Sequence, residues 1–186
     1  GFIVGIVNKK SIIDGQKIKA GDYLIGLLSS GLHTNGYSLA RKVLFEDHNF
    51  NVNTVLPELK KPLGEVLLTP HRSYLKEVSQ VLSLLSGIAH ITGGGFYENI
   101  CRILPSGVSC IINRNRWQVP EIFKIIQKLG NISSDEMYRV FNMGIGMVLF
   151  VRPQNLDVVL KMLSRCKIIG RVVKGNFGVK LTDQDE

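Results

Sequence analysis

Residues 91–100 read Ile-Thr-Gly-Gly-Gly-Phe-Tyr-Glu-Asn-Ile, so three successive glycines stand between an apolar stretch and a segment with helical character. Glycine has no Cβ and adopts positive φ, so its backbone amides can turn toward one anion in front of a helix N-terminus. The glycines are contiguous and no Lys-Ser/Thr pair follows them, which excludes a P-loop and a dinucleotide fingerprint. The stretch therefore predicts a strand, a tight turn and a helix, with the turn either cradling a phosphate or binding nothing.

The pattern on both sides of this turn alternates strands with helices. Runs rich in Val, Ile, Leu and aromatic residues between turn signals predict strands at 2–8, 23–28, 88–92, 108–112, 144–151, 168–173 and 177–181. Apolar residues at helical spacing, together with capping residues, predict helices at 34–47, 73–86, 96–104, 120–129, 134–140 and 156–163. The predicted fold class is α/β in the wide sense that includes α+β, with a mixed β-sheet flanked by helices.

The composition predicts one folded domain over residues 1–186. A chain of 186 residues with 45% hydrophobic content can bury a substantial core, and no stretch has the composition of a linker. Residues 1–7 are apolar but too few to cross a bilayer, and no basic region precedes them, so we expect neither a signal peptide nor a membrane span. Cys101, Cys110 and Cys166 contain no C-x-x-C pair and cannot all form disulfides, which favours buried thiols in the reducing cytoplasm.

The formal net charge of +8 is spread over separated basic pairs. These pairs have no interleaved aromatic residues, and no helix-turn-helix or ribonucleoprotein signature accompanies them. We therefore expect no nucleic-acid partner. An anionic small substrate, together with solvated surface charges, accounts for the sign of the net charge.

Two further segments combine with the glycine turn into one pattern. Residues 29–41 read Ser-Ser-Gly-Leu-His-Thr-Asn-Gly-Tyr-Ser-Leu-Ala-Arg, and residues 136–147 read Glu-Met-Tyr-Arg-Val-Phe-Asn-Met-Gly-Ile-Gly-Met. In this order, the three segments resemble the C-terminal half of the phosphoribosylformylglycinamidine cyclo-ligase family, the aminoimidazole ribonucleotide synthetases of purine biosynthesis. The resemblance continues nearly from end to end, between Gly5 and Val172.

The resemblance implies the C-terminal domain of the aminoimidazole ribonucleotide synthetase-like superfamily and an ATP-dependent ligase reaction. In that reaction ATP phosphorylates the formyl oxygen of formylglycinamidine ribonucleotide, the amidine nitrogen closes the imidazole ring, and phosphate leaves. ATP and Mg²⁺ are bound mainly by the family's N-terminal half, which is absent from these residues, so we expect this chain alone to be catalytically incomplete. The implied partners are the ribonucleotide substrate, the N-terminal half and, in the complete enzyme, a second copy in a homodimer.

The reaction requires a binding site for the ribose phosphate, and the glycine turn is the candidate for this site. The candidate phosphate- and ribose-binding residues are Thr92, Gly93, Gly94, Gly95, Glu98 and Asn99. We expect the three glycine amides to bind the phosphate, with the Thr92 hydroxyl as a further donor. Glu98 and Asn99 follow one turn later and can contact ribose hydroxyls or a neighbouring loop. A carboxylate in the first turn of a helix is also stabilised by the helix dipole alone, so Glu98 has a structural alternative.

Proton transfer at the amidine and formyl groups requires an ionisable side chain, and His33 is the candidate. It lies in a glycine-rich loop that opens a helix, and the ordinary histidine pKa of about 6.5 suits acid–base catalysis. A nearby helix N-terminus favours the neutral imidazole, which can accept a proton or hydrogen-bond to the substrate. The alternative is that His33 only orders its loop. Gly31 and Asn35 of the same loop are candidate substrate contacts, although Asn35, like Thr34, can cap the following helix, and we favour capping.

Asn142 and Gly144 are expected to line the cleft between the two halves of the enzyme, with packing as an equal alternative for the glycine. No metal site is expected in this chain, because the adjacent acidic residues at 46–47 and 135–136 lie in helical stretches without convergent carboxylates. The remaining histidines are assigned no chemical role: His48, His71 and His90.

Two rival interpretations remain open. A sibling enzyme of the same superfamily, such as a thiamin-phosphate or selenide kinase or a hydrogenase maturation factor, shares the fold but lacks the joint Ser-Gly-Leu-His-Thr-Asn-Gly-Tyr and Thr-Gly-Gly-Gly-Phe-Tyr-Glu-Asn pattern. A non-catalytic binding or assembly domain is the second rival. The presence of an ATP-binding half encoded upstream distinguishes the enzyme from this second rival.

Overall fold

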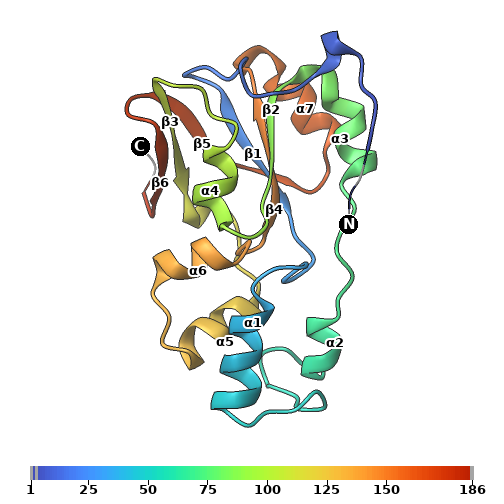
Figure 1. The fold of residues 1–186 in the computed structure, drawn as a ribbon, viewed down its shortest axis with the longest axis vertical. Helices are drawn as coiled ribbons and strands as arrows, with labels where there is room; N and C mark the ends of the chain where they lie inside the picture. Colours follow the sequence, from blue (N-terminus) through green and yellow to red (C-terminus); the bar gives the residue numbers. More distant parts are fainter. Residues whose placement is uncertain (1, 3, 185–186) are drawn as a thin grey trace.

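A six-stranded sheet occupies the upper part of the molecule, with short helices beside it and below it (Figure 1). The computed structural model describes residues 2 and 4–184. The strand order across the sheet is β2-β4-β1-β5-β3-β6. The strands are β1 (Tyr23–Leu28), β2 (Leu85–His90), β3 (Val108–Asn113), β4 (Ile145–Val151), β5 (Cys166–Lys174) and β6 (Gly178–Thr182).

Neighbouring strands are antiparallel except for β3 and β6, which run parallel, so the predicted mixed sheet is confirmed. β1 and β4 lie in the interior of the sheet, where Leu24 pairs with Phe150. Both strands are buried along nearly their whole length, because each has a strand on either side and apolar cores on both faces. These two strands therefore give firm support to the loops that leave their ends.

The helices are short, and several are joined to neighbouring elements by single 3-10 turns. The α-helices are α1 (Tyr37–Arg41), α2 (Leu63–Leu67), α3 (Leu75–Val81), α4 (Gly95–Cys101), α5 (Glu121–Leu129), α6 (Ser134–Val140) and α7 (Leu156–Met162). α1 continues directly into a π-helical segment, Lys42–Asp47. The 3-10 turns are Lys9–Ser11, Leu82–Leu84, Arg114–Arg116 and Pro153–Asn155.

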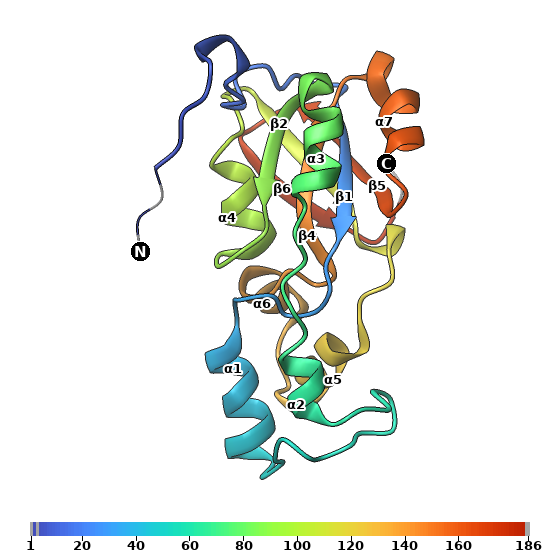
Figure 2. The same ribbon diagram turned by 90° about the vertical axis from the view of Figure 1, so that its right-hand side faces the viewer.

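The two faces of the sheet have separate cores, because successive residues of a strand point to opposite sides. Leu24 belongs to the larger core, which α4, α5 and α6 close. Ile25 and Leu27 belong to the smaller core, which α3 and α7 close. Figure 2 shows α3 in front of the sheet with α7 beside it. The larger core also continues through Leu44 and Phe123 into the lower helices, so the sheet and those helices share one hydrophobic interior.

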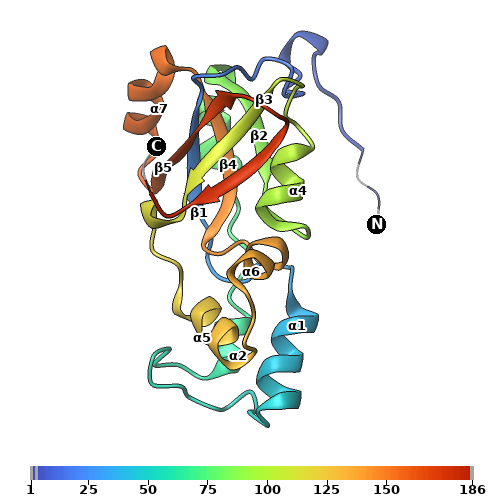
Figure 3. The ribbon, with the colours of Figure 1, turned by 90° about the vertical axis from the view of Figure 1, so that its left-hand side faces the viewer.

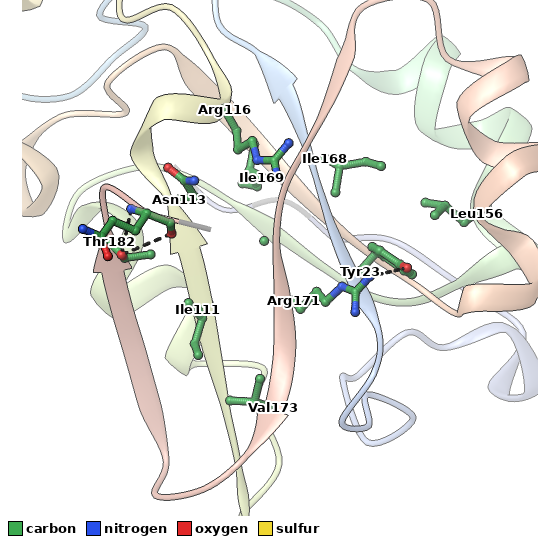
Figure 4. A pocket seen from close by; sticks show the side chains of 12 residues that line it. Tyr23, Ile111, Asn113, Arg116, Leu156, Ile168, Ile169, Arg171, Val173 and Thr182 are labelled. Carbon is green, nitrogen blue, oxygen red and sulfur yellow. Dashed lines mark hydrogen bonds between the residues drawn. The ribbon is translucent and has the colours of Figure 1, made fainter. Parts of the chain in front are cut away.

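The part of the smaller-core face formed by β5, β3 and β6 is left open. None of the described helices lies over it (Figure 3). A pocket of about 500 Å³ lies on this face (Figure 4), and the residues lining it include Tyr23, Ile111, Leu156, Ile168, Arg171 and Val173. The Arg171 guanidinium lies over the Tyr23 ring and donates to its hydroxyl at 2.6 Å. None of the candidate site residues named from the sequence lines this pocket, so it is separate from the candidate site.

The expected strand at 2–8 is wrong for the residues that the structure describes. Residues 2 and 4–8 lie outside every strand, and the side chains of Phe2 and Ile6 are fully exposed. A strand needs a partner to complete its hydrogen bonds, and none of the described strands pairs with this segment. Apolar composition alone therefore predicted an element that the fold does not use.

The helix expected at 34–47 begins later, at Tyr37, and its N-cap is Gly36 instead of Thr34 or Asn35. His33 and Gly36 have φ values of 62° and 79°, and these left-handed conformations interrupt helical geometry before Tyr37. The composition of this loop therefore predicted the helix correctly, but not the point at which the backbone enters it.

The helix expected at 73–86 ends at Val81, and a 3-10 turn follows it. Leu85 does not complete the apolar stripe of the helix, because it opens β2 and pairs with Val151 of β4. β2 consequently starts at Leu85 instead of residue 88. The other predicted helices and strands are confirmed, with ends that differ by up to three residues.

Candidate functional site

The glycine turn joins β2 to α4, as the sequence predicts. Gly94 is the N-cap of α4 with a φ of 91°, and Gly95 opens the helix with a φ of 57°. Both values lie in the left-handed region, where a side chain is strained. A Cβ on Gly95 would also overlap the Tyr138 carbonyl of α6. Gly95 is therefore required by close packing as well as by the turn.

Asn99 holds this turn together from its buried side. Its side-chain amide donates to the carbonyl oxygens of Gly95 (2.7 Å), Gly93 (3.2 Å) and Thr92 (3.3 Å). The Thr92 hydroxyl donates to Oδ1 of Asn99 (3.1 Å), and the Gly95 amide donates to the Thr92 carbonyl oxygen (3.0 Å). Two of the donors expected to bind phosphate are thus used inside the turn. The expected phosphate contacts narrow to the amides of Gly93 and Gly94.

The Glu98 carboxylate lies beside Gly94, among the atoms nearest to the position that a Cβ there would take. It also forms an ion pair with Arg102 (3.1 Å), and both side chains are more than half exposed. Such a pair stabilises a helix only weakly. A carboxylate repels an approaching phosphate but accepts hydrogen bonds from hydroxyl groups. Glu98 therefore fits a contact with ribose hydroxyls better than a contact with phosphate.

Asn142 holds the loop that carries His33 in place through hydrogen bonds of its side chain. The hydrogen-bond partners of its buried side chain are the carbonyl oxygens of Gly31 (2.8 Å) and Leu32 (3.1 Å), the Ser29 hydroxyl (2.8 Å) and the Gly144 amide (2.9 Å). An asparagine amide offers two donor hydrogens and one acceptor oxygen with two lone pairs, and all of these are used within the protein. The structure therefore gives Asn142 a supporting role behind the loop.

Gly144 and Gly31 also have structural roles in these loops. Gly144 has a φ of 99°, and a Cβ on it would lie 2.7 Å from Cδ of Pro120. This close approach favours the packing alternative for Gly144. Gly31 is buried, and its carbonyl oxygen is bound to Asn142, so it shapes the loop from behind.

The loop of His33 and the glycine turn meet at Asn35 and Gly93. Oδ1 of Asn35 lies 3.5 Å from the position that a Cβ on Gly93 would take. The favoured capping role of Asn35 is wrong, because the N-cap of α1 is Gly36 and receives no side-chain hydrogen bond. The Asn35 side chain instead lies against the glycine turn, where it can contact a ligand bound there.

His33 is held in a left-handed backbone conformation, with a φ of 62°, and its side chain is 4% exposed. Such a conformation costs about 1–3 kcal/mol and clusters at ligand sites. The Ser30 amide donates to Nε2 of His33 at 3.1 Å. In the neutral imidazole this bond leaves the proton on Nδ1. Nδ1 is buried and has no hydrogen-bond partner, so it carries an unused donor.

The pKa of His33 is lowered from 6.5 to about 4, first by burial and then by positive charge on His71, His90 and Arg72. Each of these effects disfavours the imidazolium form. His33 is therefore neutral at pH 7, as expected, although burial and not a helix N-terminus is the main cause. Because the Nε2 lone pair accepts from Ser30, the neutral ring is set up to donate through Nδ1.

Two histidines to which the sequence assigned no chemical role lie next to His33. The rings of His33 and His71 stack with centroids 3.9 Å apart and 16° between their planes, and the centroids of His71 and His90 are 5.3 Å apart. One ring nitrogen of each lies within 4.8 Å of the others. A cavity of about 470 Å³ opens beside His71 and His90, and Tyr74 and Met147 also line it. We call His33, His71 and His90 the histidine cluster.

The register of the sheet creates the histidine cluster. His90 ends β2 and pairs with Met147 of β4, and a Cβ on the adjacent Gly146 would lie 2.7 Å from Cε1 of His33. Gly146 therefore leaves room for the imidazole. His71 comes from the segment between α2 and α3. No local spacing connects these three histidines, so no pattern in the sequence indicates the cluster.

Residues 19–181 match the family model described as AIR synthase related protein, C-terminal domain. The chain belongs to this family. It is 50% identical to the phosphoribosylformylglycinamidine cyclo-ligase of Thermoanaerobacter sp. (strain X514), over 97% of this chain and 55% of the relative. The enzymes of the same name from Caldanaerobacter subterraneus subsp. tengcongensis and Bacillus cereus (strain G9842) are 52% and 47% identical, over 97% and 94% of this chain and 55% and 52% of the relatives. The chain spans about half the length of these curated relatives and corresponds to their C-terminal half.

Two solved structures of other proteins share the fold. Thiamine-monophosphate kinase from Stenotrophomonas maltophilia K279a superposes with a TM-score of 0.63 at 14% identity, over 96% of this chain and 55% of that chain. The hydrogenase maturation protein HypE of E. coli superposes with a TM-score of 0.55 at 17% identity, over 90% of this chain and 48% of that chain. At these identities the likeness shows the fold alone. Among the described residues, no helix has the length and apolar character to cross a lipid bilayer.

Proposed function

We propose that this chain forms one domain over residues 1–186 and is the C-terminal domain of a phosphoribosylformylglycinamidine cyclo-ligase. The observation that carries the proposal is 50% identity along 97% of the chain to enzymes of that name. The reaction transfers a phosphoryl group from ATP to the formyl oxygen of formylglycinamidine ribonucleotide. The amidine nitrogen then closes the ring and phosphate leaves. This chain supplies one wall of the active-site cleft.

The ribose phosphate binds at the glycine turn in this proposal. The amides of Gly93 and Gly94 are the donors, since the Thr92 hydroxyl and the Gly95 amide already donate to acceptors within the turn. Glu98 accepts hydrogen bonds from ribose hydroxyls, and Asn35 contacts the ligand from the facing loop. Asn99 acts by holding the turn in place and does not itself touch the substrate.

His33 donates a hydrogen bond through Nδ1 to a substrate oxygen. The Ser30 amide sets this tautomer, and the low pKa of about 4 keeps the ring uncharged at pH 7. A neutral donor placed in a buried site stabilises negative charge that develops on the oxygen, because its dipole is already oriented and little water competes. His33 is the catalytic residue of this chain in the proposal.

The N-terminal half supplies most of the site for ATP and Mg²⁺. Support for ATP comes from relatives of the same fold, since one thiamine monophosphate kinase was solved with AMPPCP and one HypE with ATP. The complete enzyme is a cytoplasmic homodimer, and this chain without its N-terminal half is inactive. No nucleic acid or membrane takes part in the proposal.

The test joins this chain to the N-terminal half of the Thermoanaerobacter relative and measures ATP-dependent formation of aminoimidazole ribonucleotide. The joined enzyme should turn over, and His33→Asn should lower kcat by roughly 10²- to 10⁴-fold without a change in Tm. His48→Asn is the matched control, because His48 bonds to the Val43 carbonyl oxygen away from the cluster. It should leave turnover unchanged.

A folded joined enzyme that forms no product would overturn the proposal and favour a non-catalytic binding domain. Near-normal turnover of His33→Asn would remove the catalytic role of His33 and leave the family function standing. Phosphorylation of thiamine monophosphate by the joined enzyme, in place of ring closure, would assign the chain to the rival kinase class.

A further inference from the structure

We propose that the histidine cluster, His33, His71 and His90, binds a divalent first-row transition ion of the Zn²⁺ class. Imidazole nitrogens are ligands that Zn²⁺, Co²⁺ and Ni²⁺ favour. Three histidines with a fourth position open to water form a recurring site for such an ion. The inference concerns ion binding by this chain itself and does not depend on the proposed function. The ion and the substrate oxygen of the proposed function would compete for the same nitrogen, Nδ1 of His33.

The positions of the three nitrogens suit a shared ion. One ring nitrogen of each histidine lies within 4.8 Å of the other two. Tetrahedral Zn²⁺ with bonds of about 2.0–2.1 Å places its nitrogens about 3.3 Å apart. Closing a triangle of this size onto the ion moves each nitrogen by about 1 Å or less. The three nitrogens therefore need to move little, although the stacked His71 ring must also change its orientation.

A second, independent observation concerns His33 itself. His33 is 4% exposed, and its Nδ1 is buried without a hydrogen-bond partner. Nearly all buried polar atoms of native proteins have a partner, and an orphaned one requires an explanation such as a bound ion, a water molecule or a catalytic role. In the absence of substrate, an ion in the cluster gives Nδ1 a partner, whereas a purely structural role of the ring leaves it unsatisfied.

Binding requires two local changes, and neither outweighs chelation. Coordination through Nδ1 of His33 moves the imidazole proton to Nε2 and ends the hydrogen bond from the Ser30 amide. The stacked His71 ring must also turn, because an ion lies in the plane of each ring that binds it. The lost hydrogen bond weakens binding about fivefold. Protein sites for Zn²⁺ reach dissociation constants below about 10⁻⁷ M, so a fivefold loss still leaves a dissociation constant below about 10⁻⁶ M.

The charges around the cluster allow a cation. The positive charge of Arg72 acts on His33, but Arg72 is paired with Glu77 and also donates to the Leu28 carbonyl oxygen at 2.8 Å. The pair is close to neutral as a unit, so it opposes a dication only weakly. Mg²⁺ prefers oxygen ligands in an octahedral arrangement, and the three imidazoles select against it. The site is therefore distinct in chemistry from a magnesium–nucleotide site.

The test titrates the 186-residue chain at about pH 7.5 with ZnCl₂ in a calorimeter, and with CoCl₂ while the visible absorbance of tetrahedral Co²⁺ is followed. We expect one ion per chain and no competition from millimolar Mg²⁺. Loss of an outer partner of a metal ligand already costs about 10- to 100-fold in affinity, so His71→Asn and His90→Asn, which remove ligands, should each weaken binding by about 100-fold or more. His48→Asn, outside the cluster, should bind as tightly as the unchanged chain.

Circular dichroism of each variant establishes that it is folded before its affinity is compared. Absence of saturable Zn²⁺ binding by the unchanged chain would overturn the inference. Binding that survives in folded His71→Asn and His90→Asn variants would overturn it as well, because the ion would then lie elsewhere. Displacement of the ion by Mg²⁺ would show an oxygen-ligand site and contradict the cluster.

Discussion

Asn99 and Asn142 are each only one side chain, yet each holds a whole loop of the candidate site. Asn99 binds the carbonyl oxygens of the glycine turn, and Asn142 joins Ser29 and Gly31 to the loop before β4. An asparagine amide both donates and accepts, so it can satisfy several backbone groups that a turn leaves open. A buried group left unpaired costs about 1–3 kcal/mol, which makes these positions sensitive to substitution. Their effect on ligands is therefore exerted through the backbone.

The pKa of His33 leads to a prediction about stability at the residue scale. It is lowered from 6.5 to about 4 in the folded chain, chiefly by burial. Between these pH values the unfolded chain binds more protons than the folded one, so the free energy of unfolding falls as pH decreases through this range. Above about pH 7 the His33 ring is neutral in both the folded and the unfolded chain, so its titration no longer changes the free energy of unfolding.

Urea denaturation of metal-free protein between about pH 4 and about pH 7.5 measures this dependence. His33→Asn should show a flatter profile, because asparagine tolerates the left-handed backbone and does not titrate. His48→Asn is the matched control and should retain the slope of the unchanged chain. Parallel profiles for the unchanged chain and His33→Asn would contradict the assignment of the slope to His33.

At the scale of elements, the site is formed where β2 turns into α4 and where the loop after β1 meets it. α4 packs against α6 so closely that only glycine fits at residue 95, beside the Tyr138 carbonyl. This contact fixes the angle at which α4 leaves the turn. The turn is therefore positioned by helix packing as well as by its own backbone conformation.

Gly95→Ala and Gly107→Ala separate these two contributions. Both glycines have positive φ, 57° and 80°, so both substitutions introduce backbone strain of similar size. A Cβ on Gly107 meets no atom within 4 Å, whereas a Cβ on Gly95 overlaps Tyr138. We expect Gly95→Ala to lower the free energy of unfolding by about 1–3 kcal/mol more than Gly107→Ala, as measured in urea. Equal losses would show that strain alone decides the effect.

At the scale of the whole molecule, β1 and β4 bind the two cores into one unit. Leu24 lies in the larger core and Leu27 in the smaller one, so neither core can lose its packing while β1 stays in place. The larger core also reaches the lower helices. This sharing predicts that the chain unfolds in one cooperative step.

Leu27→Ala tests this cooperativity from the smaller core. Leu27 is 1% exposed, and its truncation should cost about 2–5 kcal/mol. Trp117 is the only tryptophan of the chain and lies in the larger core, so its fluorescence reports the opposite face of the sheet. The midpoints of Trp117 fluorescence and far-ultraviolet circular dichroism should shift together. A fluorescence midpoint that stays in place would show that the two cores unfold separately.

The sequence by itself determined the family, the mixed sheet and the order of most helices and strands. It also determined the strand, glycine turn and helix around residues 91–100, because turn formation depends on neighbours in the chain. It failed at 2–8 and at 73–86, where apolar composition does not tell which segment finds a partner strand. Hydrogen bonds between strands are long-range, and their pattern follows from the assembled sheet.

Only the tertiary structure decided how the candidate site is divided between ligand contacts and supports. Asn142 and Asn99 became supports because the loops around them needed buried donors and acceptors. His71 and His90 joined His33 because the pairing of β2 with β4 carries His90 to the place where Gly146 leaves room for an imidazole. Such neighbours are far apart along the chain, and the register of the sheet, which no local pattern records, brings them together.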